Sequence, residues 1–223
     1  MSRLWRSLAA CAAAACCIAA HAQAEYAPPS GKGRVVVVLS GQLGAGHYIA
    51  AARQIAEMGY DVTLLDGNDY RGEQGEAIKD AIAKATQSAH ALPGKVAVVG
   101  FSLGGGEAIG RVARWPDLVA GIVVMYPLTA FVEHPDRFVA SLKVPVLMLA
   151  GEADTYKDCC RIEKARAIAD AASTSQHQPP FELVTYPRAD HDFIMPGRSY
   201  NGAAAGDAWK RTEARLREYF AGS

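Results

Sequence analysis

The chain has 223 residues and a formal net charge of zero, with 50% hydrophobic and 21% charged residues. This composition is typical of one globular domain and excludes a disordered or fibrous chain. Because the sequence contains no run of Lys and Arg, we expect no nucleic-acid partner and no electrostatic membrane surface.

The first 24 residues are predicted to be a signal peptide. Two arginines precede an unbroken apolar run over residues 8–20, and a small-x-small pattern at residues 22–24 supplies a cleavage site. The run is too short to span a bilayer, which requires about 20 residues. We therefore expect cleavage between Ala24 and Glu25, a periplasmic or secreted protein, and no stable membrane insertion. A lipoprotein signal ending at Cys11 is the alternative.

The mature chain keeps only two cysteines, the adjacent Cys159 and Cys160. Neighbouring Cα atoms lie about 3.8 Å apart across a trans peptide bond, whereas disulfides usually join Cα atoms that are about 4.4 to 6.8 Å apart. In an oxidising compartment the pair can form a strained ring, bond to another chain, or remain as buried thiols. We favour one of the first two.

After a leader over residues 25–33, strands and helices alternate along the chain. The first strand contains four successive valines, which is typical of a strand covered on both faces. The predicted strands are residues 34–39, 62–65, 96–99, 118–126, 144–150 and 181–186. The predicted helices are residues 48–58 and 75–89, one after Ser102, one at about 162–172, and a last one that contains Trp209, Leu216 and Phe220, with a connection at 127–143. This order predicts one α/β domain over residues 34–223, a doubly wound, mostly parallel sheet with helices on both faces.

The stretch Lys95–Gly106, KVAVVGFSLGGG, is predicted to be a nucleophile elbow. In this motif a buried strand runs into a tight turn around Ser102 and continues as a helix. The turn forces the serine into a sparsely allowed backbone conformation, and Gly100 and Gly104 make room because they have no Cβ atom. The alternative interpretation is a glycine-rich loop that holds an ordinary serine.

Polar residues follow two later strands, at the edge where the carboxyl ends of parallel strands meet. Asp154 follows the strand that ends at Ala150, and His191 follows the strand that ends at Tyr186. The chain order of Ser102, Asp154 and His191 is that of the triad in α/β-hydrolases. The sequence therefore predicts a catalytic triad.

Each residue has a chemical role in such a triad. His191 takes a proton from Ser102 as the serine adds to a carbonyl group, and then gives it to the leaving group. Asp154 holds the imidazole in the correct tautomer and stabilises its cation. The oxyanion is expected to bind the backbone NH groups of Leu103 and of Gln42, in the loop after the first strand.

Other acids and histidines compete for these roles. The alternative acids are Glu152, Asp158, Asp190 and Asp192. The remaining histidines of the mature chain are His47, His90, His134 and His177. We expect these histidines to be solvated or structural, because they lie in loops or on helices rather than after the last strand.

The motifs GFSLGG, LMLAGEAD and YPRADHDF, followed by a helix containing Trp209, resemble those of the dienelactone hydrolase group of the α/β-hydrolase superfamily. The likeness covers the chain from Val35 to Phe220. It implies a sheet of eight strands or slightly fewer, a shallow site without a large lid, and hydrolysis of small esters or lactones.

Some positions depart from the dienelactone hydrolases. Those enzymes use a cysteine where this chain has Ser102, and they have an acidic residue at the position of Gly41. They also have an arginine shortly after the histidine, where this chain has Ile194 and Met195. In those enzymes the acid and the arginine grip an acidic lactone. Because this chain lacks both groups, the resemblance implies a general serine esterase. The doubled glycine Gly104-Gly105 also resembles acyl-peptide-cleaving relatives, so a serine peptidase or aminoacyl hydrolase is the alternative.

Two other classes of function are alternatives to a hydrolase. Residues 35–66 contain a strand, a glycine loop, a helix, a strand and an acid, Asp66, 20 residues after Gly46, as in dinucleotide-binding units. However, Ile49 stands where a third small residue is needed, which disfavours an NAD-dependent oxidoreductase. A non-catalytic binding protein of the same fold is the other alternative. No metal-ligand spacing is present, so we expect no metal, no cofactor, and a small ester or lactone as partner.

Overall fold

A computed structural model of the chain describes residues 23–70, 75–175 and 179–222. Apart from its last two residues, the predicted signal peptide lies outside the described residues, and so does His177. Among the helices described, none has both the length and the apolar character that a membrane span requires.

A single sheet of seven strands runs through the described part of the chain. The strands are β1 (Gln23–Tyr26), β2 (Val35–Leu39), β3 (Asp61–Leu65), β4 (Val96–Phe101), β5 (Val119–Met125), β6 (Val146–Gly151) and β7 (Phe181–Tyr186). Their order is β1-β3-β2-β4-β5-β6-β7, and every neighbouring pair is parallel except β1 with β3. The predicted doubly wound, mostly parallel α/β sheet is confirmed.

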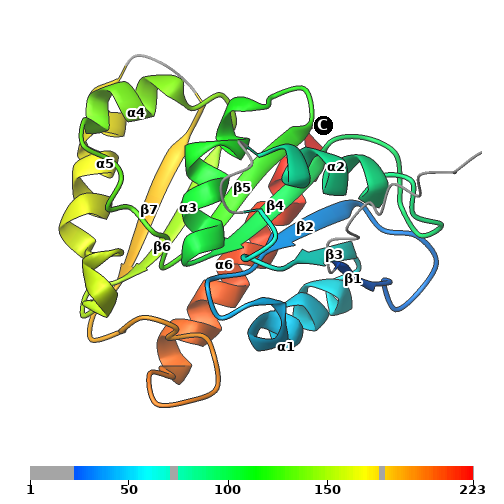
Figure 1. The fold of residues 1–223 in the computed structure, drawn as a ribbon, viewed down its shortest axis with the longest axis horizontal. Helices are drawn as coiled ribbons and strands as arrows, with labels where there is room; N and C mark the ends of the chain where they lie inside the picture. Colours follow the sequence, from blue (N-terminus) through cyan, green and yellow to red (C-terminus); the bar gives the residue numbers. More distant parts are fainter. Residues whose placement is uncertain (1–22, 71–74, 176–178, 223) are drawn as a thin grey trace, which may run out of the picture.

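Helices cover both faces of this sheet (Figure 1). They are α1 (Ala45–Glu57), α2 (Glu76–Ala85), α3 (Leu103–Gly110), α4 (Pro135–Ser141), α5 (Ile162–Thr174) and α6 (Gly202–Ala221), with short 3-10 helices η1 (Val112–Arg114) and η2 (Tyr156–Asp158). Buried side chains of α1 and α6 pack on one face, and those of α2, α3, α4 and α5 pack on the other. Both faces of the central strands are therefore shielded from water.

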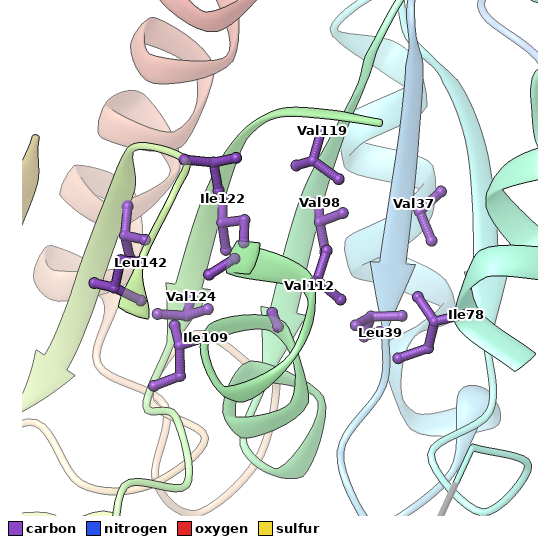
Figure 2. Packing of buried hydrophobic residues seen from close by; sticks show 14 of the residues in the cluster. Val37, Leu39, Ile78, Val98, Ile109, Val112, Val119, Ile122, Val124 and Leu142 are labelled. Carbon is purple, nitrogen blue, oxygen red and sulfur yellow. The ribbon is translucent and has the colours of Figure 1, made fainter. Parts of the chain in front are cut away.

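The central strand β2 shows why its apolar run is continuous. Successive side chains of a strand point to opposite faces, so β2 supplies two separate cores. Val37 and Leu39 pack on the face covered by α2 and α3, whereas Val36 and Val38 pack against α1 and α6. Figure 2 shows the first core, in which Ile78 of α2 lies beside Leu39. A strand buried on both sides cannot alternate apolar and polar residues.

Strand β1 and helix α4 were not predicted, and neither were the short 3-10 helices η1 and η2. Strand β1 contains polar residues and lies at the sheet edge, where Gln23 and Ala24 pair with Leu65 and Leu64. It carries no apolar run that could indicate a strand, and it extends across the predicted cleavage point. Helix α4 lies within the connection predicted at 127–143, and its Pro135 at the first helical position is a recognised start signal.

Helix α1 begins three residues earlier than predicted. Its buried side chains include Ala52, Ile55 and Ala56. Ile49 is 36% exposed, whereas the neighbouring Tyr48 is 1% exposed.

The acid at the end of β3 has a structural role. Asp66 accepts a hydrogen bond at its Oδ2 atom from the backbone NH of Ala45, the first residue of α1, at 2.7 Å. Its Oδ1 atom accepts from the backbone NH of Asn68 at 2.9 Å. Partial burial opposes ionisation, but these hydrogen bonds outweigh it and lower the pKa of Asp66. The segment that resembled a dinucleotide-binding unit thus uses its acid to cap a helix.

We predict that Asp66→Ala lowers the free energy of unfolding by about 1 kcal/mol, as the loss of a helix cap does. Asp66→Asn keeps an acceptor and should lose less. Because folding lowers the pKa of Asp66, the extra stability of the carboxylate is present above its ordinary pKa of about 4 and is lost as the pH falls through the folded value.

Urea unfolding of the three proteins at about pH 7 and about pH 3 measures both effects. The stability gap between wild type and Asp66→Asn should narrow at the lower pH. Equal stability of all three proteins at the higher pH would contradict the capping role.

Candidate active site

Ser102 lies in the turn between β4 and α3, with backbone angles of φ 49° and ψ −114°. This left-handed conformation is rare for a residue with a side chain and marks a strained turn. A Cβ atom on Gly104 would overlap the Leu39 carbonyl group and lie 2.6 Å from the carbonyl oxygen of Ser40. A Cβ atom on Gly100 would lie 2.6 Å from the carbonyl oxygen of Gly104. The glycines permit the close approach of helix and strands that the predicted elbow needs.

The structure brings together the three residues of the predicted triad. Ser102 Oγ lies 3.0 Å from Nε2 of His191. Nδ1 of His191 lies 2.7 Å from Oδ2 of Asp154, and it donates because a carboxylate only accepts. The second carboxylate oxygen of Asp154 accepts from the backbone NH of Tyr156 at 3.0 Å. All three triad side chains are buried, so the hydrogen-bonded chain is shielded from bulk water.

The four alternative acids are engaged elsewhere. Glu152 accepts hydrogen bonds from the side chains of Arg166 and Thr185, and Asp158 accepts one from Arg161. Asp190 accepts a hydrogen bond from the backbone NH of His191. A carboxylate oxygen of Asp192 lies 3.6 Å from Nε2 of His47. Among the residues described, only Asp154 bonds to the imidazole ring through a carboxylate. The catalytic role of Asp154 stays a prediction.

The loop after β2 lies directly against the serine. A Cβ atom on Gly41 would lie 3.1 Å from Cβ of Ser102 and would overlap the hydroxyl of Tyr48. Tyr48 thus occupies the space into which a longer side chain at position 41 would extend. Leu103 begins α3, so its backbone NH is one of the donors that a helix start leaves free. Leu103 directly follows the serine, and Gln42 and Ser102 line the same small cavity; their role as oxyanion donors stays a prediction.

The sequence did not predict Tyr156, which covers the base. Its ring stacks on the imidazole of His191, with centroids 4.5 Å apart and planes 10° apart. Its hydroxyl also accepts a hydrogen bond from the side-chain amide of Gln42. This bond joins the loop after β2 to the turn after β6, and the cavity left at Ser102 is only about 10 Å³. Gln42 and Tyr156 both line this small cavity.

A second aromatic group supports the base from another side. Tyr126, at the end of β5, packs the edge of its ring against His191 with centroids 4.8 Å apart, and its backbone φ is 39°. Burial, reinforced by the negative charge of Asp192, raises the pKa of both Tyr126 and Tyr48 far above the ordinary value. Both hydroxyls therefore stay neutral.

Cys159 and Cys160 form a disulfide, one of the two favoured arrangements. The carbonyl oxygen of Cys159 accepts hydrogen bonds from the backbone NH groups of Thr129 and Ala130, at 2.9 and 3.0 Å. One ring nitrogen of His191 and the two sulfur atoms lie within 4.8 Å of one another. The disulfide thus lies beside the base, although its sequence spacing indicated no site.

A groove of about 430 Å³ begins next to the serine. Its apolar lining includes Leu103, Leu128 and Phe131, and Phe131 is exposed. The backbone NH of Leu128 donates to the carbonyl oxygen of Ser102 at 2.8 Å, which fixes this wall to the elbow. A larger cavity of about 570 Å³ lies between α1 and α6. Ser102 lines neither of these two cavities, but the smaller groove is lined by Leu103, the residue next to the serine. The smaller groove is therefore the one nearer to the elbow.

A serine on a strained strand-to-helix turn, joined to a histidine and an acid that follow later strands, defines an α/β-hydrolase fold. The dienelactone hydrolase family model matches residues 65–220. The chain belongs to the dienelactone hydrolase family.

Among curated proteins, the chain is 32% identical over 155 residues to a Saccharolobus solfataricus protein provisionally named carboxymethylenebutenolidase, covering 69% of this chain and 56% of that one. It is 26% identical over 147 residues to protein usf of Aquifex pyrophilus, covering 63% and 60%. It is 33% identical over 97 residues to a cutinase of Thermobifida fusca, covering 42% and 30%. The chain spans little more than half the length of the first two relatives.

Solved structures show the same fold. A provisionally assigned dienelactone hydrolase from Klebsiella pneumoniae aligns with a TM-score of 0.72 at 21% identity, covering 90% of this chain and all of that one. Esterase 2 of Thermogutta terrifontis, with propionate bound, aligns with a TM-score of 0.66 at 19% identity, covering 88% of each chain.

Proposed function

We propose that this protein is a serine hydrolase that cleaves small carboxylic esters or lactones through an acyl-enzyme. The observation that carries the proposal is the buried chain of hydrogen bonds from Ser102 through His191 to Asp154, on a strained elbow. Membership of the dienelactone hydrolase family supports it, as does the likeness to proteins named as a cutinase and an esterase.

The reaction follows from the positions of the donors and acceptors. Ser102 Oγ attacks the carbonyl carbon while its proton passes to Nε2 of His191, at 3.0 Å. The carbonyl oxygen becomes an anion and binds the backbone NH groups of Leu103 and Gln42. The tetrahedral intermediate then collapses, and Nε2 gives its proton to the departing alkoxide. The acyl group remains on Ser102.

Water completes the cycle by the same proton transfers. Nε2 of His191 takes a proton from water as the water oxygen attacks the acyl carbon, and Ser102 regains its proton when the acid leaves. Asp154 stabilises the imidazolium cation formed in both halves. The backbone NH of Tyr156 fixes the acid in turn.

The positions that grip an acidic lactone in dienelactone hydrolases differ in this chain. The groove beside the elbow has an apolar wall of Leu103, Leu128 and Phe131, and Glu107, Arg111 and Arg114 also line it. Ile194 and Met195, at the position where dienelactone hydrolases have an arginine, are buried in the core. With Tyr48 beside Gly41, the groups that grip an acidic lactone are replaced by apolar and neutral ones. A general ester is therefore the better substrate.

We infer that the protein is exported, because the pattern at residues 1–24 is that of a signal peptide and disulfides persist in oxidising compartments. Expression in a bacterium with an outer membrane, followed by amino-terminal sequencing of the periplasmic protein, should give a chain that begins at Glu25. A cytoplasmic chain that retains Met1 would contradict export, and a lipid-modified Cys11 would indicate a lipoprotein.

We predict that Ser102→Ala reduces kcat by about 10⁴-fold or more, because the nucleophile is lost. A fluorophosphonate probe should label the wild type and leave Ser102→Ala unlabelled. A panel of p-nitrophenyl esters of increasing chain length, with lactone and aminoacyl substrates beside them, should show the highest kcat/KM for short neutral esters.

If the wild type did not react with the probe, the proposed hydrolase function would be contradicted, and a non-catalytic binding protein would be favoured. Preference for the aminoacyl substrates would instead support the peptidase alternative. Thermal unfolding of Ser102→Ala is the control for its fold.

We predict that Tyr156 positions His191 through its ring. Tyr156→Ala removes a stacked pair, which is worth about 0.5 to 1.5 kcal/mol, so kcat should fall up to about tenfold. Tyr156→Phe keeps the ring and loses only the hydroxyl that Gln42 contacts, so kcat should recover while KM changes. Steady-state kinetics on one p-nitrophenyl ester separates the two effects. A Phe variant with as low a kcat as the Ala variant would assign the role to the hydroxyl.

A further inference from the structure

We propose that Cys159 and Cys160, when reduced, form with His191 a binding site for a soft divalent cation such as Zn²⁺ or Cd²⁺. An ion in this site takes the base out of the triad and stops ester hydrolysis. The loss of hydrolysis rests on the proposed function, whereas the binding of the ion does not.

The ligand atoms are already close together. The two sulfur atoms and a ring nitrogen of His191 lie within 4.8 Å of one another. In a tetrahedral zinc site, with bonds of about 2.3 Å to sulfur and about 2.0 to 2.1 Å to nitrogen, ligand atoms lie about 3.6 to 3.8 Å apart. Once the sulfur atoms are no longer bonded to each other, shifts of about 1 Å bring all three to these separations.

His191 has the surroundings of a metal ligand. Its Nδ1 atom donates to Asp154 at 2.7 Å, which leaves Nε2 as the nitrogen with a lone pair. Histidines that bind metals commonly donate their other ring NH to a carboxylate, which fixes the tautomer and strengthens the ligand. Asp154 therefore prepares Nε2 equally for a proton from Ser102 and for a cation.

The cysteine pair is held beside the base by bonds that do not depend on the disulfide. The carbonyl oxygen of Cys159 accepts from the backbone NH groups of Thr129 and Ala130. Cys160 is 4% exposed, whereas Cys159 is only partly buried and gives an ion a path from solvent. Reduction should therefore leave both sulfur atoms next to His191.

The chemistry requires a reductant and releases protons. A dithiol reductant gives two electrons to the Cys159–Cys160 bond, which breaks, and each sulfur takes a proton while the reductant becomes a disulfide. The cation then displaces both thiol protons and accepts the lone pair of Nε2 from neutral His191. In the oxidised protein neither sulfur carries the charge that a cation needs, so the site exists only after reduction.

Titration with Cd²⁺ tests the binding without any substrate. The full chain is reduced with dithiothreitol, freed of reductant without oxygen, and compared with the oxidised chain. Reduced protein should bind one Cd²⁺ with the ultraviolet charge-transfer absorption of cadmium thiolates, and the oxidised chain should show none. Circular dichroism of the reduced chain checks its fold. Unfolding on reduction, or a folded dithiol without this absorption, would overturn the proposal.

Matched variants separate the two kinds of ligand. The double variant Cys159→Ser, Cys160→Ser should show no charge-transfer absorption, and Cd²⁺ should leave its own rate of hydrolysis unchanged. His191→Ala keeps both sulfur atoms, so the absorption should persist with an affinity for Cd²⁺ at least about tenfold weaker. If His191→Ala bound Cd²⁺ as tightly as the wild type, the two sulfur atoms alone would hold the ion. That result would overturn the role of the histidine.

Hydrolysis of p-nitrophenyl acetate measures the second half of the proposal. One equivalent of Cd²⁺ should stop most of the activity of the reduced wild type, and a chelator should restore it. Tight binding with undiminished hydrolysis would overturn inhibition. If neither redox form hydrolyses any ester, the proposed function fails, while the cadmium absorption still decides whether the site exists.

Discussion

The close approach of α3 to the end of β2 is the constraint on which the site depends. Only a residue without Cβ fits at position 104, because the backbone of Leu39 and Ser40 occupies the space beside it. This approach places Ser102 against the Gly41–Gln42 loop, with the start of α3 directed at the same point. Ser102 and the candidate oxyanion donors Leu103 and Gln42 are thus neighbours, because the start of α3 contacts the end of β2.

Patterns that repeat along the chain predicted most of the fold. Continuous apolar strands indicated a sheet covered on both faces, and the alternation with helices indicated parallel pairing; both are confirmed by the topology. Strand β1 could not be found this way, because a short polar edge strand is held mainly by its pairing with β3. Helix α4 has only seven residues, too few for a periodic pattern to show.

The candidate site was predictable only to the extent that it follows from strand ends. Ser102, Asp154 and His191 each follow a strand, so parallel pairing alone places them at one edge. Tyr156 and the cysteine pair depend instead on the path of one irregular turn. Lys157 and Asp158 both have positive φ angles, of 47° and 54°, which no sequence pattern here indicated.

That turn, residues 154–160, concentrates the contacts of the base in one short segment. Asp154 bonds to the ring of His191, Tyr156 stacks on it, and the disulfide of Cys159 and Cys160 lies beside it. The same segment is tied to itself, since the NH of Tyr156 holds the carboxylate of Asp154. A change in the bonding state of the two sulfur atoms therefore acts on the part of the chain that orients the imidazole. Proton transfer and thiol chemistry meet at one histidine because a single turn supplies the partners for both.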